Sequence, residues 1–122
     1  MTTVLVVEDN VEFGIIISEF LRYKGYQVQN VRSAEAAIEI LNNEAIDVAI
    51  ADLYLVGNLT GIDVLLRHKK LYPKGCRILF TAAISDMVRS VCLYIDTVCL
   101  EKPFPLDELV QKVESMLEIN SH

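Results

Sequence analysis

The segment that decides the fold is DVAIAD at residues 47–52, a short apolar run that ends in an acid. A run of this length without alternating polar residues is typical of a strand that is covered on both faces, as in a parallel sheet. We predict a strand over residues 47–51, with Asp52 at its carboxyl end. Because an acid at the end of a buried strand needs partners or solvent, Asp52 is the first candidate for a functional residue.

Further short apolar runs flank this segment on both sides. These runs are mostly apolar and predict strands at residues 3–7, 26–31, 77–81 and 97–100. Amphipathic patterns between and after the strands predict helices at residues 11–24, 33–43, 61–71, 86–94 and 105–118. Strands that alternate with helices indicate βαβ units around a parallel sheet. The sequence therefore predicts an α/β fold, with one doubly wound domain over residues 1–122.

Composition limits the classes of function. The net charge is −6, from 17 acidic and 11 basic residues, which disfavours direct binding to nucleic acid. No apolar run approaches the roughly 20 residues that span a bilayer, and the N-terminus lacks the pattern of a signal peptide. We therefore expect a cytoplasmic protein that does not enter a membrane. The three cysteines have neither CxxC spacing nor nearby histidines, so we expect reduced, packed thiols.

Several polar residues come at or directly after the carboxyl ends of predicted strands. They are Glu8 and Asp9 after the first strand, Asp52 after the third, Thr81 at the end of the fourth and Lys102 after the fifth. Open α/β sheets place their ligand sites at this edge. Right-handed crossovers and a chain reversal between the first and third strands would bring the five residues into one crevice.

These residue types suit phosphoryl transfer. Crowded carboxylates repel one another, so a site made of Glu8, Asp9 and Asp52 needs raised pKa values or a cation. Mg²⁺ prefers oxygen ligands and is usually held by one or two carboxylates together with phosphate oxygens. A carboxylate beside that ion can attack phosphorus, while Lys102 and the Thr81 hydroxyl can contact the phosphoryl oxygens. The residues predict an Mg²⁺-dependent phospho-acceptor site.

Four separated motifs together resemble the receiver domain of two-component response regulators. They are LVVEDN at 5–10, AIAD at 49–52, ILFTAA at 78–83 and EKPF at 101–104. The resemblance covers nearly the whole chain and implies a flavodoxin-like, CheY-like sheet of order 2-1-3-4-5. It implies that Asp52 is the phospho-acceptor and that Glu8, Asp9, Asp52 and the backbone carbonyl of Tyr54 hold Mg²⁺. Thr81 and Lys102 would contact the phosphate.

The resemblance also implies partners and a switch. The phosphoryl group would come from the phosphohistidine of a sensor histidine kinase or a phosphotransfer protein. Movement of the Thr81 hydroxyl would repack the face formed by residues 86–94, 97–100 and 105–118, for contact with a downstream protein or a second copy of the chain. This would make the protein a signalling phospho-acceptor rather than an enzyme acting on a separate substrate. The output would be either protein contact by a stand-alone receiver or the task of residues outside this sequence.

Some positions depart from the family pattern. Cys99 stands where an aromatic switch residue is common, and the loop after Asp52 lacks the usual proline. Tyr54 and Ala83 occupy the two positions that commonly tune attack by water, which predicts a long-lived phosphorylated form. The segment 86–94 is apolar on much of its surface, which suggests a partner or dimer surface. His68 lies in a basic run that we expect to face water.

Two alternatives stay open at this point. A phosphorylation-independent pseudo-receiver would use the same fold and act only by protein contact or dimerisation. A flavodoxin-like electron carrier or a small nucleotide-binding enzyme would share the sheet topology. The absence of GxxxxGK[ST] and of GxGxxG after the first strand disfavours the second alternative.

Overall fold

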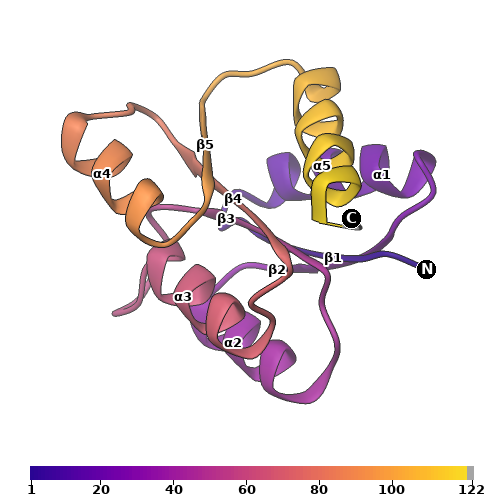
Figure 1. The fold of residues 1–122 in the computed structure, drawn as a ribbon, viewed down its shortest axis with the longest axis horizontal. Helices are drawn as coiled ribbons and strands as arrows, with labels where there is room; N and C mark the ends of the chain where they lie inside the picture. Colours follow the sequence, from indigo (N-terminus) through magenta and orange to yellow (C-terminus); the bar gives the residue numbers. More distant parts are fainter. Residues whose placement is uncertain (121–122) are drawn as a thin grey trace.

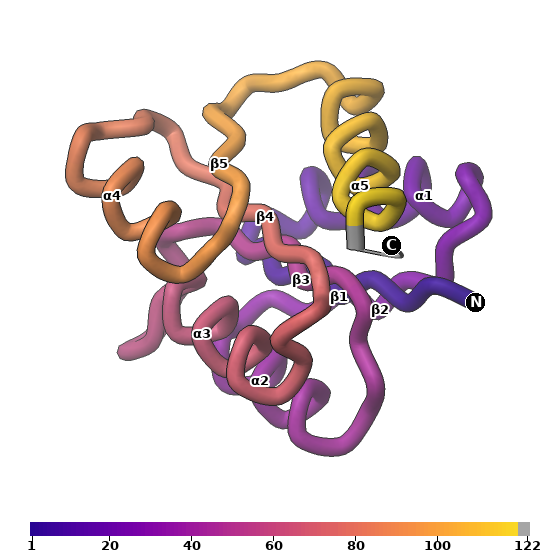
Figure 2. The backbone as a smooth tube through the Cα atoms, in the orientation of Figure 1, coloured from indigo at the N-terminus to yellow at the C-terminus, as the bar shows by residue number. Residues whose placement is uncertain are grey.

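The computed structural model describes residues 1–120 and shows a parallel sheet of five strands. The strands are β1 (Thr3–Val7), β2 (Gln27–Val31), β3 (Val48–Asp52), β4 (Cys76–Thr81) and β5 (Val98–Glu101). Every neighbouring pair is parallel, and the spatial order is β2-β1-β3-β4-β5. β2 and β3 lie on opposite sides of β1, so the direction in which strands are added to the sheet reverses after β2. Figure 2 traces this path of the backbone. The predicted fold class and strand order are confirmed.

Helices cover both faces of this sheet. They are α1 (Val11–Tyr23), α2 (Ala34–Asn43), α3 (Gly61–Leu71), α4 (Asp86–Tyr94) and α5 (Leu106–Asn120). Figure 1 shows α1 and α5 on one side of the strands and α2 and α3 on the other, with α4 beside β5. Each helix lies within two residues of its predicted bounds, because the apolar spacing and the capping residues both mark the same ends.

The central strands β1 and β3 are largely apolar because both of their faces are buried, whereas the edge strand β2 carries Gln27, Gln29 and Asn30 and is partly exposed. In β1, Val4 and Val6 pack with side chains of α1 and α5, whereas Leu5 and Val7 pack with side chains of α2 and α3. All four are completely buried. Successive side chains of a strand point to opposite faces, so this run supplies two cores at once. That is why it reads as a continuous hydrophobic segment.

Capping side chains fix the starts of the helices. Asn10, Ser33, Thr60 and Ser85 each accept a hydrogen bond from a backbone N–H in the first turn of the following helix. Such a cap contributes about 1 kcal/mol, because it satisfies an N–H that has no partner within the helix. Gly25, with φ of 101°, takes the left-handed conformation after α1.

The expectation that His68 faces water is wrong. Its ring is completely buried, with Nε2 2.9 Å from the carbonyl oxygen of Ile46 and Nδ1 3.0 Å from Nη1 of Arg77. Since a guanidinium can only donate, Nδ1 accepts and Nε2–H donates to Ile46, which is the neutral imidazole. Gly75 leaves room for the ring, because a Cβ there would lie 2.6 Å from His68 Cε1. Sequence position within a basic run did not reveal which helix face this residue occupies.

The expectation of three reduced cysteines is also corrected. Cys92 of α4 and Cys99 of β5 are joined by a disulfide, while Cys76 is buried outside this bond. The two bonded residues are close because α4 turns directly into β5. A separation of seven residues does not predict this pairing, because it matches no local cysteine motif such as CxxC.

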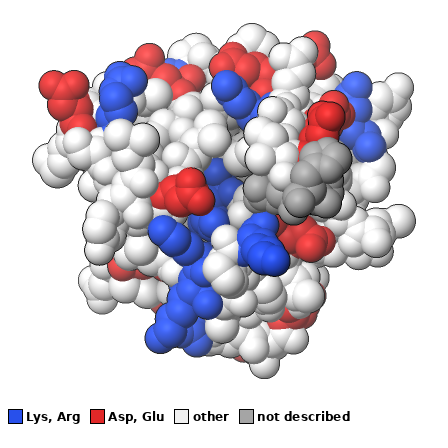
Figure 3. Space-filling model, viewed as in Figure 1, with Lys and Arg blue, Asp and Glu red and all other residues white. Residues whose placement is uncertain are grey.

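The surface carries both signs of charge. Figure 3 shows Lys and Arg side chains gathered over α3 on the face seen in Figure 1, with acidic side chains spread around them. Within residues 1–120, the helices are too short or too polar to qualify as membrane-crossing segments.

Candidate functional site

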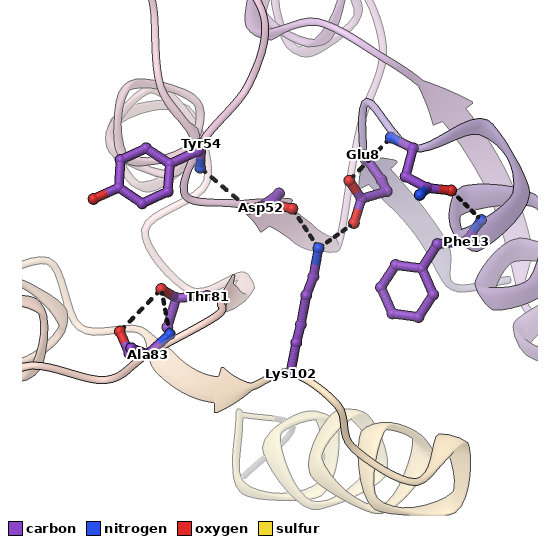
Figure 4. A network of polar contacts seen from close by, with 8 residues as sticks. Glu8, Phe13, Asp52, Tyr54, Thr81, Ala83 and Lys102 are labelled. Atoms are coloured by element: carbon purple, nitrogen blue, oxygen red, sulfur yellow. Dashed lines mark hydrogen bonds and ion pairs between the residues drawn. The ribbon is translucent and has the colours of Figure 1, made fainter.

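The predicted site residues lie at or directly after the carboxyl ends of four strands. Asp52 is the last residue of β3 and Thr81 the last of β4, while Glu8 and Lys102 directly follow β1 and β5. Because the strands are parallel, these ends lie along one edge of the sheet. Figure 4 shows Lys102 reaching from the end of β5 to the space between Asp52 and Glu8. Stretches of chain that are distant in sequence therefore meet at one place.

Three carboxylates form an acidic cluster in this crevice. One carboxylate oxygen from each of Glu8, Asp9 and Asp52 lies within 4.8 Å of the others. Glu8 is 1% exposed and Asp52 is 8% exposed, whereas Asp9 is partly buried. Like charges this close in a poorly solvated site repel strongly. The donor set consists only of hard anionic oxygens, which is the ligand set that suits Mg²⁺.

Lys102 supplies the positive charge in this arrangement. Its ammonium donates a hydrogen bond to Glu8 Oε1 at 2.6 Å and another to Asp52 Oδ2. Nζ also lies 4.9 Å from the centroid of the Phe13 ring, a distance at which a cation is attracted to the ring face. Burial lowers the pKa of Lys102, but the bonds to Asp52 and Glu8 outweigh this effect, and the net pKa is raised. Lys102 is therefore held as a cation.

Burial controls the charge on Glu8. Removal from water raises the pKa of Glu8 to about 7, although the hydrogen bonds from Lys102 and from the backbone N–H of Asn10 act in the opposite direction. The Asn10 bond measures 3.2 Å to Oε2. A second carboxylate, that of Asp52, contributes further to the rise. Without an additional cation, Glu8 titrates near neutral pH, and a cation at the cluster would favour its ionised form.

Tyr54 contacts Asp52 through its backbone. Its N–H donates to Asp52 Oδ1 at 3.1 Å, while the side chain is 72% exposed. Figure 4 shows the ring beside the acidic crevice and directed away from it. The amide contact was not predicted. The metal-binding role predicted for the Tyr54 carbonyl stays a prediction.

Gly61 has a structural role at the site that was not predicted from the sequence. A Cβ at Gly61 would lie 1.9 Å from the backbone oxygen of Asp52, so any side chain there would displace the strand end. The Gly61 N–H also donates to the carbonyl of Leu53 at 3.0 Å. The first residue of α3 thus packs directly on the backbone that carries the candidate acceptor.

Thr81 belongs to the same edge but its hydroxyl points elsewhere. Oγ1 donates to the carbonyl oxygen of Ala83 at 3.1 Å, and Figure 4 shows this pair apart from Asp52. The carbonyl of Thr81 accepts from the backbone N–H of Lys102 at 2.8 Å, so the two residues are linked through the main chain. Cys99 lies deeper in β5 and is bonded to Cys92. The structure therefore gathers Glu8, Asp9, Asp52 and Lys102 most closely.

Comparison with known proteins gives a consistent result. The family model described as the response regulator receiver domain matches residues 4–114. Response regulator SaeR from Staphylococcus aureus is 29% identical over 119 residues, which are 96% of this chain and 51% of that protein. The chain spans about half the length of the curated relatives it matches.

Solved structures share the fold. A CheY-like response regulator receiver domain protein from Methanospirillum hungatei superposes with a TM-score of 0.92 at 22% identity, covering 99% of this chain and 97% of that one. A response regulator protein from Burkholderia pseudomallei, solved with a phosphorylated aspartic acid, calcium ion and citrate, superposes with a TM-score of 0.83 at 20% identity. The second match covers 99% of this chain and 72% of that one.

Proposed function

Because the chain belongs to the family of response regulator receiver domains, we propose that it receives a phosphoryl group on Asp52 and acts as a signalling switch. The donor is the phosphohistidine of a sensor histidine kinase or of a phosphotransfer protein, and the protein works in the cytoplasm. The observation that carries the proposal is the meeting of Glu8, Asp9, Asp52 and Lys102 at one edge of the sheet. The structure with a phosphorylated aspartic acid supports it by analogy of fold.

The chemical step is a transfer between two nucleophiles. An oxygen of the Asp52 carboxylate attacks phosphorus, a P–O bond forms, and the P–N bond to the donor histidine breaks with its electron pair remaining on the imidazole. The Tyr54 N–H orients Asp52 by binding Oδ1. The Lys102 ammonium, which now binds Asp52, shifts to the incoming phosphoryl oxygens and balances their charge.

The acidic cluster fits Mg²⁺. Glu8, Asp9, Asp52 and the backbone carbonyl of Tyr54 would hold the ion, as the first three already lie within 4.8 Å of one another. When bound, Mg²⁺ neutralises negative charge on the transferring group. The raised pKa of Glu8 supports the same view, because burial of this carboxyl is better tolerated when a cation compensates its charge.

Phosphorylation would act on the neighbouring surface through Thr81. A phosphate adds about −1.5 to −2 charges and three acceptor oxygens at Asp52, to which the Thr81 hydroxyl can turn from Ala83. The added charge and the new hydrogen bond would favour a second packing of α4, β5 and α5. Because Cys99 stands in place of an aromatic residue, this change of packing would reach the surface without the rotation of an aromatic ring.

The face formed by α4, β5 and α5 is the output surface of the proposed switch, and its α4 part carries exposed apolar side chains. Met87, Leu93 and Tyr94 are 74%, 80% and 83% exposed, which is unusual for large apolar side chains on one short helix. This surface suits a downstream protein or a second copy of the chain, rather than nucleic acid. The same observation favours the phosphorylation-independent alternative, in which this surface alone carries the function.

Intact mass after incubation with acetyl phosphate and Mg²⁺ tests the acceptor. We expect wild type to gain the mass of one phosphoryl group and Asp52→Asn to gain none. Asp107→Asn, which removes an exposed acid from α5, is the matched control and should gain the same mass as wild type. Equal labelling of Asp52→Asn and wild type would overturn the assignment of Asp52.

Beryllofluoride with Mg²⁺ separates the two candidate functions. As a phosphate mimic, it should shift amide resonances near Asp52 and along α4 and β5 in wild type. No shift, in protein whose spectrum shows a folded chain, would favour the pseudo-receiver. Shifts near Asp52 that do not extend to α4 and β5 would retain the acceptor but remove the proposed switch.

A further inference from the structure

We propose that Cys92 and Cys99 are a reversible thiol–disulfide site, oxidised by a low-molecular-weight disulfide of the glutathione type, that ties α4 to β5. The two residues are bonded in the structure, with their Cα atoms 6.6 Å apart. This separation falls within the span of about 4.4–6.8 Å that a disulfide bridges. Oxidation at this site would change the output surface independently of phosphorylation of Asp52.

The backbone keeps the two cysteines close whether or not they are bonded. The carbonyl of Cys92 accepts from the N–H of Thr97 at 2.9 Å, and the Val91 carbonyl accepts from the N–H of Ile95 at 2.9 Å. Asp96 completes the tight turn with a left-handed φ of 56°. On the strand side, Cys99 is fixed by its pairing with Leu79 of β4. The reduced pair is therefore already positioned for oxidation.

Burial gives the two sulfurs different roles. Cys92 is 3% exposed, so a reagent cannot easily reach it, whereas Cys99 is only partly buried and is the more accessible of the two residues. Cys76 lies in the other core, which packs against α1 and α5, while Cys92 and Cys99 belong to the core on the α2 and α3 side. The sheet separates Cys76 from the pair.

The exchange proceeds in two balanced steps. The Cys99 thiolate attacks one sulfur of the small disulfide, which forms a mixed disulfide at Cys99 and releases one small thiolate. The Cys92 thiolate then attacks the Cys99 sulfur and releases the second small thiolate. Two cysteine thiols are oxidised, one small disulfide is reduced to two thiols, and the two protons pass to the released thiolates. An excess of small thiol reverses both steps.

The bond restrains a lightly anchored helix. Cys92 is the buried residue of α4, and the exposed side chains of this helix include Met87, Leu93 and Tyr94. A helix with so few buried side chains opens locally at a low free-energy cost. The disulfide adds a covalent anchor at the carboxyl end of α4, so oxidation should restrain the surface that the proposed switch repacks.

Peptide mapping provides the primary test. Wild type is equilibrated in glutathione buffers from reducing to oxidising, alkylated and digested with trypsin. Cys92 and Cys99 fall in one peptide, residues 90–112, because the Lys102-Pro103 bond resists cleavage, and Cys76 falls in another. In oxidising buffer we expect peptide 90–112 to escape alkylation and to lack two hydrogen atoms. In reducing buffer it should carry two alkyl groups.

Variants make the assignment specific. Cys76→Ala should retain the bonded peptide, whereas Cys92→Ala and Cys99→Ala should lose it. Circular dichroism of each variant confirms that the chain is folded. Three outcomes would overturn the proposal: full alkylation of peptide 90–112 in oxidising buffer, a disulfide that includes Cys76, or a bond that excess small thiol does not open in the folded protein.

Hydrogen exchange tests the tie between α4 and β5. Amides of Asp86–Tyr94 should exchange roughly 10-fold more slowly in oxidised than in reduced wild type, with no such difference in folded Cys99→Ala. Amides of α2 serve as an internal reference and should not change. Equal exchange of α4 in both redox states would show that the bond does not restrain the helix.

Discussion

Lys102 donates a hydrogen bond to Glu8 at 2.6 Å, although 94 positions separate the two residues in the sequence. The same ammonium binds Asp52, so one cation serves two carboxylates at the edge of the sheet. Its position between them makes Lys102 both a stabilising group and a candidate contact for the phosphoryl group.

Replacing Lys102 with Met should affect stability and phosphorylation differently. Without Mg²⁺, Glu8 and Asp52 lose their shared cation, and the free energy of unfolding should fall by roughly 2 kcal/mol. Added Mg²⁺ should recover most of this loss, since it supplies the missing charge, while the rate of phosphorylation by acetyl phosphate stays about 100-fold lower. Urea denaturation and intact mass measure the two effects. Lys112→Met, at an exposed position of α5, should change neither. A Lys102→Met protein that phosphorylates as fast as wild type would contradict the proposed role.

Gly61→Ala should destabilise the site itself. The new Cβ would lie 1.9 Å from the backbone oxygen of Asp52, so the strand end or α3 must move, at a cost of roughly 3 kcal/mol. Gly14→Ala is the matched control, because its Cβ meets only the movable side chain of Asn30, at 3.1 Å, and alanine favours the helix. Thermal denaturation compares the two variants. Equal stability of both would show that the chain relaxes around residue 61 without cost.

His68 should make stability depend on pH. Burial lowers its pKa from 6.5 to about 4; the nearby charge of Arg77 acts in the same direction, and the Ile46 carbonyl and Asp47 oppose it. Between these pKa values the unfolded chain binds a proton at His68 that the folded chain does not, so acidification destabilises the fold. Over the full interval the loss is about 3 kcal/mol, at ~1.4 kcal/mol per pH unit.

His68→Gln isolates this contribution. Glu8 titrates in the opposite sense over part of the same range, since its folded pKa is raised, so the measured quantity is wild type minus variant. Urea denaturation at pH 5 to 7 should give a wild-type free energy of unfolding that rises with pH relative to the variant. If the two curves run parallel, His68 is not held neutral in the folded state.

Tyr54→Asn should shorten the lifetime of the phosphorylated form by about 10-fold, which corresponds to ~1.4 kcal/mol in the barrier to attack by water. The Tyr54 ring lies beside the crevice while its N–H holds Asp52, so the substitution changes the side chain without removing the backbone contact. Loss of label from the phosphoprotein measures the rate. Tyr23→Asn, an exposed change on α1, should leave it unaltered. If wild type loses label as fast as Tyr54→Asn, the Tyr54 side chain does not slow hydrolysis of the phosphorylated form.

Local patterns in the sequence were sufficient for most of the fold. The apolar run before Asp52 predicts a strand with two buried faces, and the amphipathic pattern at residues 33–43 predicts α2, because both signals depend on neighbouring residues alone. The strand-end positions of Glu8, Asp52 and Lys102 also follow from local patterns. The rule that parallel strands share one carboxyl edge then brings them together.

By itself, the sequence determined the elements, the class of sheet and the identity of the residues at its carboxyl edge, since apolar periodicity and capping act over a few positions. Only the tertiary structure decided which groups are joined by a hydrogen bond, a shared cation or a covalent bond. Lys102 between two carboxylates, His68 neutral against Arg77, and Cys92 bonded to Cys99 all depend on side chains from different elements. Such contacts depend on distances in space, which the spacing of residues along the chain does not specify.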